Sequence, residues 1–302
     1  MAQPFLSSSR LAQKYQALGF TLGITCKGNI TALRLALAAA LCGEAVPERI
    51  LLRLEGEFPG FGDYYFEQLV AMAAFYGVDF QMSFAKSSGV REAKQWLLDN
   101  CRTPYLWISD DDVLPDSWCL SEFSEQLPQV ASACALMQEE WGFICGAKFD
   151  VNNRRKYPDF SDRPHVLKKG ETLGWLALQN LAYYPDEDAD RYHLTKIFDG
   201  GCVVLNVPML RRKELKFTVA GPSAPSSGVD TLMALRCAKV GLKGFFLPFA
   251  HAVHLEKPVS NFESGADRKE MLLRLCDLEG LDHSIVDRGL FAGIPVTGSE
   301  PK

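Results

Sequence analysis

The chain has 302 residues, of which 47% are hydrophobic and 23% charged, and its formal net charge is −5 at pH 7. That is enough apolar material for one large packed domain or two small ones. No block of lysine and arginine indicates a nucleic-acid groove, and the longest apolar stretch, Leu33 to Cys42, is interrupted by Arg34 and too short to span a bilayer. We therefore expect a cytoplasmic protein, which could also associate peripherally with a membrane.

The nine cysteines are an odd number and include no Cys-x-x-Cys pair. Many of them lie in apolar runs, namely Cys26, Cys134, Cys145, Cys202 and Cys237. This pattern predicts reduced core residues and argues against a disulfide framework or a zinc site.

The first half of the chain alternates strand-like and helix-like segments. Strands are predicted at 20–26, 49–54, 78–84 and 105–109, and helices at 31–41, 63–76 and 90–100. Thr31 is the predicted cap of the first helix, and Ser87 or Ser88 that of the third. This βαβαβαβ order predicts a mostly parallel, doubly wound α/β sheet, which binds ligands at the carboxyl ends of its strands. The polar residues that follow three of those ends are Lys27, Asn29, Glu55, Glu57, Asp110 and Asp112.

Three consecutive carboxylates, Asp110-Asp111-Asp112, end the fourth predicted strand. Adjacent carboxylates repel one another, so a divalent cation among them would explain the cluster. Such a cation commonly joins carboxylates to a diphosphate. A solvated acidic turn is the alternative interpretation of the same residues.

The second half of the chain is less regular. A strand is predicted at 141–149, a polar and aromatic region at 151–198, and a short strand at 245–247. Gly200-Gly201 precedes an apolar run, and the loop Gly221 to Gly228 leads into a helix that Val229 and Asp230 open.

Taken in order, these motifs resemble those of the family 2 type of GT-A nucleotide-sugar glycosyltransferases, over residues 18 to 256. The family series has an acidic residue after the second strand, a basic-amide pair on a helix, a metal-binding DxD motif and a Gly-Gly segment. An acidic residue at a helix start then precedes an arginine, a glycine and a histidine. The similar positions here are Glu55, Lys94-Gln95, Asp110-Asp111-Asp112, Gly200-Gly201, Asp230, Arg236, Gly241 and His254.

Three of these motifs depart from the family pattern. Glu55 replaces an aspartate, Lys94-Gln95 replaces an Arg-Asn pair, and Val229-Asp230 replaces a Glu-Asp pair. The chain therefore resembles a divergent member, and two other readings stay open. One is a nucleotidyltransferase or sugar-nucleotide synthase, although the first turn has one glycine and no glycine-rich phosphate loop. The other is a catalytically inactive nucleotide-binding scaffold.

The resemblance implies a metal-dependent hexosyltransferase that moves a sugar from a nucleotide sugar, expected to be a UDP-sugar, to an acceptor hydroxyl. Asp230 is the expected general base, which implies inversion at the anomeric carbon. The alternative for Asp230 is a charge that complements a helix dipole, in which case a retaining mechanism stays open. Asp112 would bind Mn²⁺ or Mg²⁺ directly, Asp110 would hold ribose or bind the metal through water, and Asp111 would point away.

The remaining site residues have weaker assignments. Glu55 would bind the nucleoside, with Glu57 as a competing candidate, and Lys94 and Lys27 would meet phosphate or lie on a solvent face. His254 would complete the metal shell, or pair with His251 in a loop or the core. The aromatic residues that would stack on an acceptor, or belong to the core instead, are Trp118, Trp141 and Tyr183.

These expectations divide the chain into four regions. Residues 1–17 would be an N-terminal extension, 18–150 a donor-binding subdomain, 151–285 an acceptor-side subdomain and 286–302 a tail. The loop at 221–228 would be a plain connector or would close over the donor. The acceptor itself is not specified by any motif.

Overall fold

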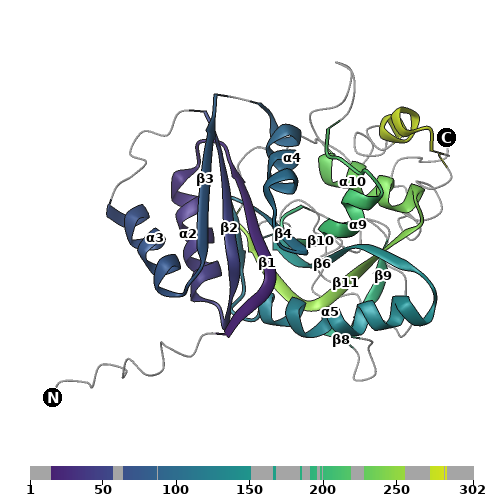
Figure 1. The fold of residues 1–302 in the computed structure, drawn as a ribbon, viewed down its shortest axis with the longest axis horizontal. Coiled ribbons are helices and arrows are strands. Elements are labelled where there is room, and N and C mark those ends of the chain that lie inside the picture. Colours follow the sequence, from purple (N-terminus) through teal and green to yellow (C-terminus); the bar gives the residue numbers. More distant parts are fainter. Residues whose placement is uncertain are drawn as a thin grey trace, which may run out of the picture.

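The computed structural model describes residues 15–56, 64–86, 88–150, 166–167, 184–185, 191–195, 198, 200–218, 228–255, 273–281 and 283. A nine-stranded sheet runs through the molecule between two layers of helices (Figure 1). Its strand order is β3-β2-β1-β4-β10-β6-β11-β5, and β9 also pairs with β11. The strands are β1 (Tyr15–Cys26), β2 (Ala45–Glu55), β3 (Asp79–Ala85), β4 (Tyr105–Asp110), β5 (Val113–Pro115), β6 (Glu140–Asp150), β9 (His193–Thr195), β10 (Val203–Asn206) and β11 (Leu242–His254).

Most strands of this sheet run in one direction, which confirms the predicted α/β class. Strands β1 to β4 are mutually parallel, β10 is antiparallel to both β4 and β6, and β11 is parallel to β6. Strands β5 and β9 are antiparallel to β11. A separate two-stranded sheet pairs β7 (Val166–Leu167) with β8 (Tyr184–Pro185).

The helices cover the two faces of the sheet as separate sets. One core contains side chains of α2, α3 and α5, and the other contains side chains of α4, α9 and α10. Strand β4 serves both cores, because Trp107 packs into the first while Leu106 and Ile108 pack into the second. The helices are α2 (Ile30–Cys42), α3 (Tyr64–Phe75), α4 (Val90–Asn100), α5 (Cys119–Leu136), α9 (Val207–Arg212) and α10 (Val229–Lys239). In the part of the chain that the structure describes, no helix is long and apolar enough to cross a membrane.

Both predicted helix caps differ from those observed. Asn29 caps α2, since its side chain accepts a hydrogen bond from the Ala32 amide at 3.3 Å, and Thr31 lies exposed inside the helix. Gly89, at φ 92°, caps α4 without a side-chain bond. Ser88 does not cap α4 because its hydroxyl and amide both donate to Glu55, and Ser87 lies outside the described residues.

Strand β11 is much longer than the predicted 245–247. It spans thirteen residues, and its pairing with β6 shifts register between Leu247 and His251, where Pro248 interrupts the pattern. His251 and His254 therefore lie on a strand and not in a loop. Helices α5 and α9 were not predicted.

The two predicted subdomains share this one sheet. Strand β10, from the second half of the chain, lies between β4 and β6 of the first half, and β11 lies between β6 and β5. Strand β1 begins at Tyr15, inside the predicted extension. Most of the predicted acceptor region 151–198, the predicted tail 286–302 and residues 1–14 lie outside the described residues.

The five cysteines expected in the core, Cys26, Cys134, Cys145, Cys202 and Cys237, are all buried. All nine cysteines are free, and only Cys42 is exposed. Trp107 is buried as well.

Candidate active site

Several segments far apart in sequence meet at one edge of the sheet. Strand β4 is parallel to β1, with Asp110 opposite Thr25, so both strands deliver their carboxyl ends there. Strand β10 runs the opposite way, with Val203 opposite Ile108, so the chain that precedes it, including Gly200, arrives at the same edge. Segments from both halves of the chain therefore meet at these strand ends.

Lys94 lies at the centre of this edge. Its side chain is only 2% exposed, and Nζ lies 2.7 Å from Oδ1 of Asp230 and 3.6 Å from Oδ1 of Asp110. Side chains in an α-helix lean toward its N-terminus, so the stem of Lys94 on α4 carries the ammonium back toward the strand ends. Lys94 does not lie on a solvent face. It is a buried cation between two carboxylates.

Gly200 lies against this group of charges. A Cβ atom at Gly200 would overlap Oδ2 of Asp230 and would lie 2.5 Å from Nζ of Lys94. Only glycine fits there without displacing one of these side chains. Asp230 itself is the second residue of α10, two positions after the cap Gly228 at φ 79°, and a carboxylate in this first turn complements the helix dipole.

Asp112 and His254 form a second pair at the same edge. Strand β5 begins just after Asp112 and pairs with β11 so that Val113 lies opposite His254, and the Leu255 amide donates to the Asp112 carbonyl at 2.7 Å. Oδ1 of Asp112 lies 3.4 Å from Nε2 of His254. This pairing explains how two residues so distant in sequence become neighbours.

The acidic run is not a solvated turn. Asp111 is 2% exposed and Asp112 is 1% exposed, whereas the Asp110 side chain is 30% exposed. Asp111 is therefore buried, and it is not a solvent-exposed turn residue. A carboxylate and an imidazole are both acceptable ligands for manganese, so Asp112 and His254 fit part of a ligand set. Among the described residues, no three acidic, histidine or cysteine side chains gather as a complete set.

Glu55, at the end of β2, is held by the segment that starts α4. Its carboxylate accepts hydrogen bonds from the Ser88 amide at 2.7 Å, the Gly89 amide at 2.9 Å and the Ser88 hydroxyl. Nε of Arg53 lies 3.6 Å away. Burial raises the pKa of Glu55, but the hydrogen bonds from Ser88 and Gly89 and the Arg53 charge outweigh it, so the net pKa is lowered. Glu55 thus anchors the start of the helix that carries Lys94.

We expect Glu55→Gln to destabilise the protein by about 1–3 kcal/mol at pH 7, because an amide cannot replace all the bonds of the carboxylate. Since the folded-state pKa is lowered, the ionised carboxylate stabilises the fold above its unfolded pKa. That stabilisation is lost as the pH falls through the folded pKa. Urea unfolding at pH 7, 5, 4 and 3 should show wild type and variant converging in acid.

Glu140→Gln is the matched control, because Glu140 lies half-exposed at the surface, where it pairs with Arg212 and, at 3.2 Å, with Lys213, and water screens ion pairs of this kind. It should change the unfolding midpoint much less than Glu55→Gln. A difference between Glu55→Gln and wild type that stays constant down to pH 3 would contradict the assigned role.

Other predicted residues lie elsewhere. Lys27 is exposed in the turn after β1, Trp118 is 58% exposed, and Trp141 is a core residue stacked on Tyr105 with ring centroids 6.0 Å apart. Glu57, Tyr183 and residues 219–227 lie outside the described residues.

Sequence reasoning missed three contributors to the site. Ser88 was expected to cap a helix, Arg53 was not considered, and Lys148 lies beside Gly201, where its Cδ would be 2.8 Å from an added Cβ. The pair Gly200-Gly201 was the sequence feature that could have indicated side chains packed closely against the backbone there.

No family model and no curated protein sequence matches the chain. Solved structures do match. TarS from S. aureus is 11% identical, with a TM-score of 0.53 over 89% of this chain and 68% of its own. Its complex with UDP-GlcNAc is 12% identical, with a TM-score of 0.54 over 89% and 69%. The mannosyltransferase PcManGT from Pyrobaculum calidifontis, in complex with GDP-Man and Mn²⁺, is 12% identical, with a TM-score of 0.51 over 87% and 64%. At this identity the likeness shows a shared fold.

Proposed function

Because the chain has the fold of the GT-A glycosyltransferases, we propose that it is a glycosyltransferase that uses a nucleotide sugar and a divalent metal. The observation that carries the proposal is the cluster of Lys94, Asp110 and Asp230 against Gly200. The cluster supports the proposal because carboxylates and a buried cation lie together at the strand ends, where such folds bind their ligands. A UDP-sugar is the first donor to test, since TarS was crystallised with UDP-GlcNAc.

Asp112 and His254 would hold the metal, and Mn²⁺ or Mg²⁺ bound there would stabilise negative charge on the departing diphosphate. The Mn²⁺ in the mannosyltransferase complex supports the use of a divalent metal, and the assignment of the ligands rests on the chemistry of Asp112 and His254. Two protein ligands are few, but magnesium-type ions commonly take their other ligands from phosphate oxygens and water. Asp110, whose side chain is the most open of the three aspartates, would face the ribose or a metal-bound water.

Asp230 would act as the general base. One of its oxygens is held by Lys94 and the other lies against Gly200, so the carboxylate has a fixed orientation. The acceptor oxygen would attack the anomeric carbon while its proton passes to Asp230. The bond from that carbon to the diphosphate breaks, its electron pair leaves with the diphosphate, and the configuration is inverted.

Calorimetry with UDP and Mn²⁺ tests the donor site. We expect UDP to bind only when Mn²⁺ is present. In Asp112→Asn we expect the gain in UDP affinity that Mn²⁺ produces to be at least tenfold smaller, because the variant removes a charged ligand. Thermal stabilisation by each of a set of nucleotide sugars would then identify the donor. Failure of UDP, GDP and dTDP alike to bind with Mn²⁺ would reject the proposal.

A further inference from the structure

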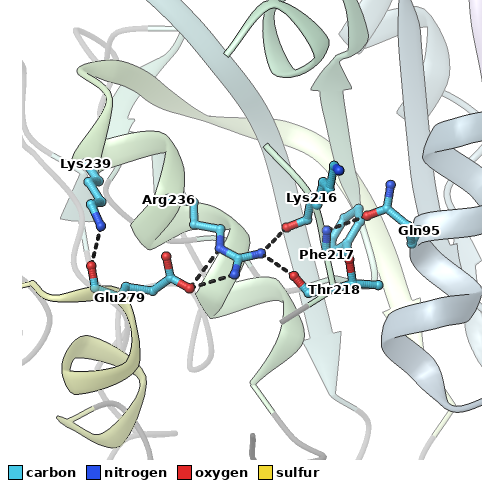
Figure 2. A network of polar contacts seen from close by, with 7 residues as sticks. All are labelled: Gln95, Lys216, Phe217, Thr218, Arg236, Lys239 and Glu279. Atoms are coloured by element: carbon cyan, nitrogen blue, oxygen red, sulfur yellow. Dashed lines mark hydrogen bonds and ion pairs between the residues drawn. The ribbon is translucent and has the colours of Figure 1, made fainter. Parts of the chain in front are cut away.

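Residues 216–218 form a short strap that is bonded to two helices at once (Figure 2). Oε1 of Gln95 on α4 accepts a hydrogen bond from the Phe217 amide at 2.7 Å. Arg236 on α10 donates from Nη1 to the Thr218 carbonyl at 2.9 Å and also to the Lys216 carbonyl. The Phe217 ring is fully buried in the core that α4 and α10 share.

Arg236 extends this network to the helical residues 273–279. Its Nε lies 3.0 Å and its Nη2 2.6 Å from Oε1 of Glu279, and both side chains are 13% exposed. Lys239, one turn further along α10, donates to the Glu279 carbonyl (Figure 2). All three guanidinium nitrogens are therefore engaged, which gives Arg236 a single orientation.

The same two helices carry the charged pair of the candidate site. Lys94 and Gln95 are consecutive on α4, while Asp230 and Arg236 on α10 are separated by about 9 Å along the helix axis. Helices α4 and α10 are thus joined at two levels, directly through Lys94 and Asp230 and indirectly through the strap. A shift of α10 by one residue, about 1.5 Å, would break the bonds at both levels.

We propose that the strap fixes the axial position of α10 against α4, and that Gln95 and Arg236 are positioning residues for Asp230. Lys94 alone cannot supply this constraint, because its stem has four rotatable bonds. The strap, in contrast, is held by backbone groups and a buried ring. The effect of the strap on catalysis rests on the proposed function, in which Asp230 is the base. The effect of the strap on the position of α10 does not depend on that function.

A double-mutant cycle tests the geometry without any activity measurement. Lys94→Met, Asp230→Ala and their combination are unfolded in urea, and the departure from additivity gives the Lys94–Asp230 coupling. We expect that coupling to change the unfolding equilibrium constant by about tenfold in the wild-type background, since residues in contact couple on this scale. In an Arg236→Met background we expect it to fall below about threefold. An unchanged coupling there would overturn the proposal.

Arg211→Met is the matched control, and Gln95→Ala is the second variant. Arg211 also binds α4, donating to the carbonyls of Leu98 at 2.8 Å and Cys101 at 2.7 Å, but no contact of this kind ties the strap to it. Its loss should destabilise the protein while leaving the Lys94–Asp230 coupling intact. If Arg236→Met does not fold, Gln95→Ala must reduce the coupling instead, and failure to do so rejects the strap.

Transfer kinetics separate this proposal from the proposed function. In Gln95→Ala we expect kcat to fall at least tenfold with the KM for the nucleotide sugar unchanged, because the base is displaced while the donor site stays intact. A wild-type protein that transfers no sugar but keeps its strap-dependent coupling would reject the function alone. If Gln95→Ala loses the Lys94–Asp230 coupling but keeps a normal kcat, the strap fixes the position of Asp230 without affecting catalysis. That result would contradict the proposal that Gln95 is a positioning residue for catalysis.

Discussion

Asp230→Asn should lower the rate of sugar transfer by about 10²–10⁴-fold, the usual contribution of a general base. Asparagine has the same shape as aspartate and can still accept a bond from Lys94 at the position of Oδ1, so the fold should survive. What it cannot do is take the acceptor proton. The affinity for UDP with Mn²⁺ should stay within a few-fold of wild type, because the predicted nucleotide and metal ligands are on other segments.

Two measurements on the same preparation check this prediction, transfer from the nucleotide sugar identified by the stabilisation screen and UDP binding by calorimetry. Asp277→Asn is the matched control, since Asp277 is 67% exposed and pairs with His283 at 2.6 Å on the surface. It should transfer at the wild-type rate. Full activity in Asp230→Asn would remove the base from the mechanism and would reopen a retaining route.

Gly200→Ala should be the second most damaging change, even though it adds a single methyl group. That group would occupy the position of the Asp230 carboxylate and would press on the Lys94 ammonium. A buried ion pair that loses its geometry keeps the cost of desolvation without the full attraction, so we expect about 3–5 kcal/mol of lost stability. Displacement of the base by about 1 Å should also lower transfer by about 10²-fold.

Gly241→Ala separates this steric effect from the general cost of replacing a glycine. Gly241 follows α10, has φ 79°, and has open space around an added Cβ. Its substitution should cost only the backbone strain of the left-handed conformation, about 1–2 kcal/mol, with transfer preserved. If Gly200→Ala proves no more harmful than Gly241→Ala in urea unfolding and in transfer assays, the packing of Asp230 against Gly200 is not a constraint.

The first half of the fold was predictable because its signals are local. Apolar periodicity predicted a helix at 90–100, which are the bounds of α4. The strand predicted at 105–109 ends one residue later, at Asp110. The predicted Ser88 cap was wrong because Ser88 has a tertiary partner in Glu55, which a local capping rule cannot include.

The second half was less predictable because its structure depends on pairing between distant segments. Nothing local indicates that β10 inserts antiparallel between β4 and β6, or that β11 continues past Pro248 to reach β5. The same limit applied to Lys94. Its residue type suggested a phosphate contact, but its partner Asp230 lies 136 positions later in the chain.

The insertion of β10 also has a consequence for biosynthesis. During translation β4 emerges with one edge unpaired, and it stays so until the segment Val203–Asn206 has been made. Asp112 likewise meets His254 only after β11 is complete. Pairings this distant in sequence form slowly. The strand ends that carry the aspartates should therefore be among the last parts of the sheet to assemble, and their assembly should depend most on chaperones.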